Sequence, residues 1–161
     1  MTGVSAVGDV FVGVNVAGGV AYFGTVEPPE RLLVGDPTDK LEPSANLRDA
    51  ARLDEFRSRV QQEFRRLKPS AVGVMRPRKY SGWQWNAAFN RAILEAAVML
   101  AAAGQGINCT IVRAEDAARA VPAPPTKVVE QAATKWNVEP TEHWKERVWA
   151  FATALALAKS N

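Results

Sequence analysis

The sequence predicts an α/β fold in which helices flank a mixed five-stranded sheet, and three observations lead to it. Residues 10–26 alternate in character on either side of a glycine pair, as two antiparallel strands joined by a tight turn do. Residues 71–75 form a short apolar run typical of a buried parallel strand. Residues 53–67 repeat apolar side chains at steps of three and four, which is the period of an amphipathic helix.

The first predicted element is the hairpin. One face of its first strand carries four valines and the other carries Phe11, Gly13 and Asn15, so we expect a strand with one heavily buried side. The glycine pair then turns the chain into the second strand. Residues 31–35 supply a third strand, which completes an antiparallel meander, and residues 36–46 are expected to form a loop.

Helices and strands alternate in the rest of the chain. After the first helix we expect strand 71–75, a long helix ending near Ala103, strand 108–112 and a helical turn over 114–120. The inward face of the long helix is predicted to be Phe89, Ile93, Ala96, Ala97 and Leu100. A short helix capped by Thr126 should follow. The last helix should open at Thr141 and bury the stripe Trp144, Val148, Phe151, Leu155 and Ala158.

Length and composition fit one globular domain over residues 10–159, preceded by a flexible N-terminus over residues 1–9. The chain has 161 residues, of which 47% are hydrophobic and 23% charged. Its net charge of +3 conceals an asymmetry, because residues 1–60 hold 6 basic and 9 acidic side chains while residues 61–161 hold 14 and 8. We therefore expect the second part of the chain to bind anions.

The single cysteine and the single histidine exclude two kinds of site. Cys109 has no second cysteine with which to form an internal disulfide, and Cys109 and His143 together cannot make a zinc cluster. We expect Cys109 to be a small buried residue, His143 a surface residue, and the compartment to be the reducing cytoplasm. The most apolar run, residues 96–103, is shorter than the roughly 20 residues that span a bilayer, so no membrane attachment is expected.

Three stretches carry a resemblance to a known family. They are VGVNVAGGVAYFGTV in the hairpin, AVGVM after the first helix and TALALA near the end of the chain. Together with the element order, they resemble the RuvC/YqgF-like members of the RNase H-like superfamily, the Holliday junction resolvases. The resemblance extends from Val10 to Lys159 and implies the RNase H-like fold for this whole stretch.

The resemblance also implies where a metal site would lie. Active members hold two Mg²⁺ ions about 4 Å apart on carboxylates of the first strand, the fourth strand and the last helix. Matched residue by residue, these positions fall on Asn15, Met75, Ala150 and Thr153, none of which is acidic. Because hard divalent cations require anionic oxygen ligands, we expect no catalytic residues, metal or cofactor, and regard the four positions as vestigial.

Two alternatives remain open for this site. If the last helix is matched one turn out of register, Glu146 is a candidate displaced ligand, and so is Glu95 on the long helix; otherwise both are solvated carboxylates. Asn15 is either the remnant of a metal site, natural or engineered from aspartate, or a residue that shapes the entry to the glycine turn.

A basic and aromatic segment follows the fourth strand. Its cations suit phosphates and its rings suit unpaired bases, and Lys127 could extend the basic track. The competing interpretation is that the tryptophans pack as core beneath a solvated loop. The candidate nucleic-acid-binding residues are Arg76, Arg78, Lys79, Tyr80, Trp83, Trp85 and Lys127.

Three functions stay open on this evidence. The first is a catalytically inactive RuvC-like protein that binds nucleic acid, DNA rather than RNA and branched DNA in particular, without cutting it. The second is a protein-interaction or dimerisation scaffold, with a homodimer or another protein as partner. The third is a Mg²⁺-dependent structure-specific endonuclease with relocated acids.

Overall fold

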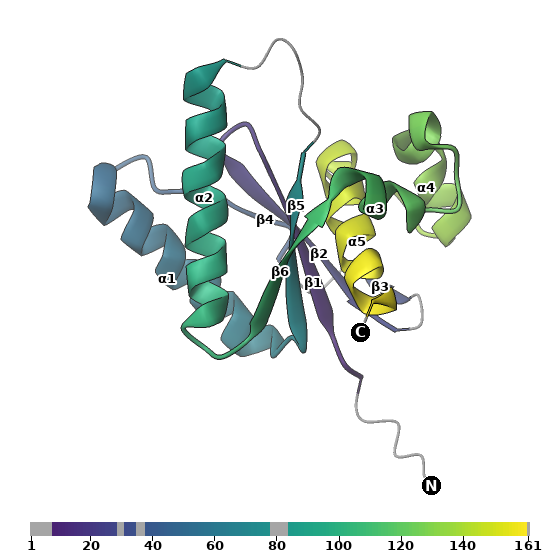
Figure 1. Ribbon diagram of the computed structural model, residues 1–161, viewed down its shortest axis with the longest axis horizontal. Helices are drawn as coiled ribbons and strands as arrows, with labels where there is room; N and C mark the ends of the chain where they lie inside the picture. Colours follow the sequence, from purple (N-terminus) through teal and green to yellow (C-terminus); the bar gives the residue numbers. More distant parts are fainter. Residues whose placement is uncertain (1–7, 29–30, 35–37, 78–83, 161) are drawn as a thin grey trace, which may run out of the picture.

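The chain forms three layers, with a sheet between two layers of helices (Figure 1). The computed structural model describes residues 8–28, 31–34, 38–77 and 84–160. Helices α1 and α2 cover one face of the sheet and α5 covers the other, with α3 and α4 beside α5. The strands are β1 (Phe11–Ala17), β2 (Val20–Glu27), β3 (Arg31–Leu33), β4 (Lys40–Leu41), β5 (Ala71–Arg76) and β6 (Asn108–Arg113). The helices are α1 (Asp49–Leu67), α2 (Trp85–Ala103), α3 (Ala114–Arg119), α4 (Val128–Trp136) and α5 (Trp144–Lys159), with a 3-10 turn η1 (Pro125–Lys127).

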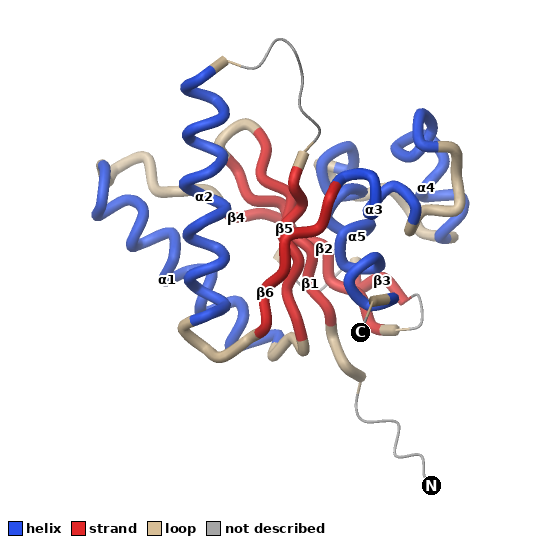
Figure 2. The backbone as a smooth tube through the Cα atoms, viewed as in Figure 1, coloured by secondary structure: helices blue, strands red, loops and turns tan. Residues whose placement is uncertain are grey.

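The sheet is mixed, as the sequence predicts. Its order is β3-β2-β1-β5-β6, with β1, β2 and β3 antiparallel in a meander and with β5 and β6 running parallel to β1 (Figure 2). One further strand, β4, pairs with β2 in the segment that we expected to be a loop. At two residues, β4 is too short to show the alternation by which a strand is detected.

The glycine pair makes the turn between β1 and β2, as expected. Gly18 and Gly19 both adopt positive φ, 58° and 77°, which is the backbone that a two-residue hairpin requires and that residues with a side chain rarely adopt. The strands then pair in register, with Asn15 opposite Tyr22.

Strand β1 is buried on both faces, whereas we expected one buried side. Val12, Val14 and Val16 pack beneath α1 and α2, and Phe11 packs on the opposite face with residues of α5. A central strand with a parallel neighbour is covered by helices on both sides, so small and apolar residues occupy both faces.

A row of glycines brings α5 directly onto the sheet. Gly24, Gly13 and Gly73 lie side by side on β2, β1 and β5. A Cβ atom on Gly13 would overlap the main-chain oxygen of Ala150, and one on Gly24 would overlap the main chain of Phe151. The absence of side chains along this row therefore sets how closely the helix backbone approaches the strands.

The inward face of α2 differs from the predicted one. Its buried residues are Leu94, Ala97, Val98, Ala101 and Ala102. Phe89 and Leu100 instead expose 51% and 61% of their surface, and Ala96 is also exposed. The exposed positions of α2 carry no charge. Its sequence therefore lacks the charged face from which the buried side of a helix is predicted.

Two helices begin later than predicted. The proline pair before Thr126 produces the 3-10 turn η1, so α4 begins at Val128 and Thr126 does not cap it. Helix α5 begins at Trp144, and the hydroxyl of Thr141 accepts a 2.8 Å hydrogen bond from the buried Arg147 and does not cap the helix. The expected stripe of α5 is buried at Val148, Phe151 and Leu155. No helix within the described ranges is long and apolar enough to span a bilayer.

Candidate nucleic-acid interface

A cavity of about 510 Å³ lies where β1 and β5 end. The two strands are parallel neighbours, and their register brings Asn15 and Met75 to the same level of the sheet. The first turns of α5 form the opposite wall. The lining residues are Asn15, Ala17, Met75, Pro77, Arg91, Ala114, Pro125, Thr126, Lys145, Glu146 and Trp149.

Asn15 is the polar centre of this cavity and is only 4% exposed. Its amide nitrogen donates to the main-chain oxygen of Glu146 at 3.1 Å, and its amide oxygen accepts from Nη2 of Arg91 at 3.2 Å. It lies within β1 and not in the turn, so it does not shape the glycine hairpin. A buried amide with both ends hydrogen-bonded ties the sheet to α5 and α2.

Arg91 is the central residue that sequence reasoning missed. Besides Asn15, its Nη2 lies 3.5 Å from the main-chain oxygen of Met75, and its Nε donates to the carboxylate of Glu95 at 3.1 Å. The side chains of Arg91 and Glu95 are 15% and 20% exposed. Burial raises the pKa of Glu95, and the guanidinium of Arg91 opposes part of that rise. The signal for this pair was an Arg and a Glu four residues apart on a helix with no other charge.

Only two of the four positions matched by the resemblance line the cavity. Asn15 and Met75 do, whereas Ala150 and Thr153 are fully buried deeper on α5. The methyl group of Thr153 lies where a Cβ on Gly73 would touch it, and its hydroxyl donates to the main-chain oxygen of Trp149 at 2.7 Å.

Glu146, one turn earlier on α5, lies at the cavity instead of Ala150. Burial raises the pKa of the nearby Tyr22 hydroxyl, and the carboxylates of Glu146 and Glu42 raise it further. The ring of His143, which we expected at the surface, is half-buried and 5.7 Å from the ring of Tyr22. Glu146 thus places negative charge beside the cavity, while Glu95 is bound to Arg91.

These residues do not fit a divalent metal ion. An amide and a thioether stand at the matched strand positions, and a guanidinium is bound to the amide oxygen. Hard cations take oxygen ligands of which several are anionic, and a fixed positive charge repels them. In the part of the chain that the structure describes, no three His, Cys, Asp or Glu residues are grouped as metal ligands would be.

The described part of the basic and aromatic segment is exposed. Arg76 ends β5 at the surface, and Trp85, which is the first residue of α2, exposes 77% of its area. The ring of Trp85 stacks on that of Phe89, with 5.9 Å between centroids and 26° between planes. Trp85 is therefore not core. Arg78, Lys79, Tyr80 and Trp83 lie outside the described residues.

Lys127 follows the lining residue Thr126 in the chain but does not itself line the cavity. It is exposed and its ammonium group is 3.4 Å from the carboxylate of Glu130. Lys145 is a second exposed cation and lines the cavity itself. Of these two cations, only Lys145 of α5 lines the cavity.

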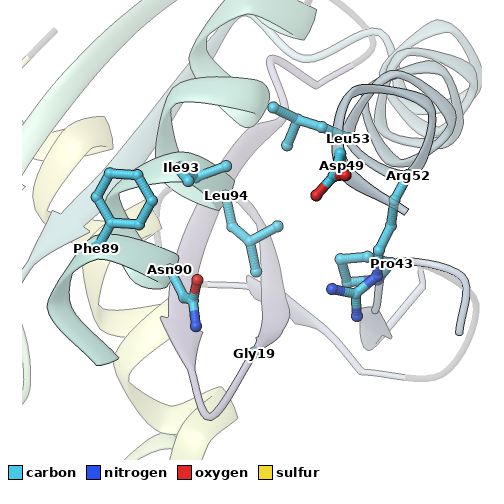
Figure 3. Close-up of a pocket in the computed structure, with 9 residues that line it drawn as sticks. All are labelled: Gly19, Pro43, Asp49, Arg52, Leu53, Phe89, Asn90, Ile93 and Leu94. Carbon is cyan, nitrogen blue, oxygen red and sulfur yellow. The ribbon is translucent and has the colours of Figure 1, made fainter. Parts of the chain in front are cut away.

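A second cavity, of about 420 Å³, opens between α1, α2 and the tip of the β1–β2 hairpin (Figure 3). Leu53, Ile93 and Leu94 form its apolar floor. Asp49 and Arg52 come from α1 and Asn90 from α2, so polar groups stand on opposite walls. Phe89 also lines this cavity, so a cavity with both apolar and polar walls lies beside the exposed Trp85–Phe89 stack.

Solved structures of similar fold decide how this architecture is classified. RuvC of T. thermophilus in complex with a Holliday junction substrate is 22% identical over 92% of each chain, with a TM-score of 0.74. The chain has a RuvC-like fold. A second T. thermophilus RuvC structure is 21% identical over 92% of this chain and 93% of that one, with a TM-score of 0.71.

A third solved structure of similar fold is that of the yeast mitochondrial Holliday junction resolvase Ydc2. It is 10% identical, covers 91% of this chain and 76% of its own, and has a TM-score of 0.57. Comparison with protein-family models and with curated protein sequences finds no match. The RuvC-like fold is thus supported by architecture, and the residues of its strand ends differ from those the resemblance implies.

Proposed function

We propose that this protein binds nucleic acid, branched DNA in particular, at the end of the sheet and does not cleave it. One observation carries the proposal: at the strand ends of a RuvC-like fold, Asn15 and Met75 stand where the resemblance implies metal-binding carboxylates, and Arg91 is bound to Asn15. The similar structure that holds a Holliday junction supports DNA as the ligand.

Exposed groups on the elements that border the cavity suit this ligand. Arg76, Lys127 and Lys145 are cations for backbone phosphates, which position a nucleic acid without reading its sequence. Trp85 and Phe89 offer an exposed stack to an unpaired base.

The test is a set of binding titrations with four-way, duplex and single-stranded DNA, each in Mg²⁺ and in EDTA. We expect salt-sensitive binding that is strongest for the four-way DNA, unchanged by EDTA and without cleavage products. On duplex DNA the log–log salt slope should be about −0.9 for each phosphate contacted. Products that require Mg²⁺ and disappear in Glu146→Gln or Glu95→Gln would instead support a nuclease with relocated acids.

Charge variants test whether DNA binds at the surface around the cavity. Arg76→Gln combined with Lys127→Gln and Lys145→Gln should make the slope shallower by about two to three units. Arg65→Gln is the control, because Arg65 is exposed in the last turn of α1, which precedes the start of β5 at the opposite end of the sheet. A change of about one unit in the control, which is the effect of one phosphate contact, would mean that binding is not confined to the cavity.

A second candidate function is docking of another protein or of a second copy of this chain. The exposed face of α2 favours it, because Phe89, Ala92, Ala96 and Leu100 form an uncharged surface along the helix. Apolar patches of this kind mark interaction sites in many proteins. Light scattering after gel filtration should give a dimer mass that Leu100→Glu reduces to a monomer mass if the partner is a second copy, and a monomer at all concentrations would exclude that partner.

A further inference from the structure

We infer that the guanidinium of Arg91 stands in this pocket in place of a metal ion, and that it keeps divalent cations out. The guanidinium contacts oxygens from three elements: the amide oxygen of Asn15 on β1, the main-chain oxygen of Met75 on β5 and the carboxylate of Glu95 on α2. The distances are 3.2, 3.5 and 3.1 Å.

These are the oxygen types that bind a hard divalent cation. Carboxylate, side-chain amide and main-chain oxygens all serve as ligands of Mg²⁺, Mn²⁺ and Ca²⁺ in proteins. Here one charged side chain holds all three, and an arginine stays protonated at every accessible pH. Oxygens of the right type for a metal ion are therefore present in this pocket, but the guanidinium of Arg91 already binds them.

Burial strengthens the repulsion between the guanidinium of Arg91 and any divalent cation that enters the pocket. Asn15 is 4% exposed and the side chains of the Arg91–Glu95 pair are 15% and 20% exposed, so water screens the charges poorly. A second cation at the same oxygens would meet the guanidinium at close range. Removing Arg91 would leave the carboxylate of Glu95 without its counter-charge, and that uncompensated carboxylate would favour an incoming cation.

The inference does not depend on nucleic-acid binding, so its test is made without DNA. Mn²⁺ is titrated into the full chain at neutral pH and counted by the loss of the free-ion electron paramagnetic resonance signal. The wild type should bind no Mn²⁺ below millimolar concentration, and Arg91→Met should bind it at least tenfold more tightly. Arg91→Met combined with Asn15→Asp should bind more tightly still, because a carboxylate replaces the amide.

Arg59→Met is the matched control. Arg59 also pairs with a glutamate four residues away, Glu55 at 3.5 Å, and donates to a main-chain oxygen, that of Glu42 at 2.7 Å, but it lies on α1 away from the cavity. It should leave Mn²⁺ binding unchanged. A gain in Arg59→Met equal to that in Arg91→Met would overturn the inference, as would wild-type binding at micromolar Mn²⁺.

Asn15→Asp alone gives an answer even if the Arg91 variants do not fold. With Arg91 present, the new carboxylate should pair with the guanidinium and gain no Mn²⁺ affinity. Tenfold tighter Mn²⁺ binding by Asn15→Asp alone would show that Arg91 does not exclude the cation, and the inference would be wrong. Nucleic-acid titrations in EDTA report on the proposed function separately, since neither result constrains the other.

Discussion

The side-chain amide of Asn15 donates to the main-chain oxygen of Glu146, and so joins two residues that are 131 positions apart in the chain. One belongs to the first strand and the other to the first turn of the last helix. A position that the resemblance assigns to a metal ligand is thus a buried tie between the two ends of the fold.

Replacing this amide should destabilise the protein. Asn15→Ala would leave the oxygen of Glu146 and a donor of Arg91 without this partner in a buried place, which costs about 1–3 kcal/mol of unfolding free energy. Asn90→Ala is the control, because Asn90 is exposed on α2. Urea unfolding measures both, and equal midpoints for the two variants would contradict the role of Asn15.

The glycine row should tolerate no side chain. In Gly13→Ala the new Cβ would lie 2.6 Å from the main-chain nitrogen of Ala154 and overlap the oxygen of Ala150, so the helix must move. We expect a loss of at least about 3 kcal/mol, the upper range for overpacking. Gly104→Ala should change stability far less, because the contact it makes at 3.0 Å is with the flexible side chain of Gln61. Thermal melts of the two variants compare them.

Removing a ring of the Trp85–Phe89 stack should weaken DNA binding without lowering the stability of the fold. Trp85→Ala removes a ring that is 77% exposed, so the melting temperature should hardly change, while affinity for single-stranded or four-way DNA should fall by about 1–3 kcal/mol. Trp136→Ala is the opposite case, because Trp136 packs partly buried between two core clusters and touches the rings of Trp144 and Phe151. It should cost about 3 kcal/mol of stability or more. A destabilised Trp85→Ala variant with unchanged DNA affinity would show that Trp85 serves packing.

The thiol of Cys109 should be unreactive at neutral pH. Burial raises its pKa to about 11, so the thiolate that reacts with alkylating agents is scarce until the solution is strongly alkaline. Alkylation of the folded protein by iodoacetamide should accelerate about tenfold for each pH unit between 8 and 10. In urea the same thiol should approach its ordinary pKa and the rate should level off near pH 9. A level rate in the folded protein over this range would contradict the raised pKa.

Local chemistry explains which elements could be predicted from sequence. The hairpin follows from Gly18 and Gly19, whose turn requires backbone angles that glycine adopts most easily, and α1 follows from the regular spacing of Phe56, Val60 and Phe64. The buried face of α2 could not be predicted, because its exposed positions are uncharged and apolar residues surround the helix.

The candidate site was predictable only in part, for a related reason. Asn15 stands out as a polar residue at the end of an apolar strand, and its strand neighbour Met75 follows from the sheet order. Arg91 does not stand out, since its partners Asn15 and Met75 are 76 and 16 residues away and only the folded chain brings them together.

The contact of α5 with the glycine row has a consequence for how the chain folds during synthesis. Strands β1 and β2 emerge from the ribosome early, yet one of their faces is covered only by the helix made more than a hundred residues later. Contacts of such long sequence separation form slowly and leave apolar surface open in the meantime. Until α5 has been made, the nascent sheet therefore presents Phe11, Val26 and the bare glycines to solvent, and it is in this interval that the chain is most open to aggregation.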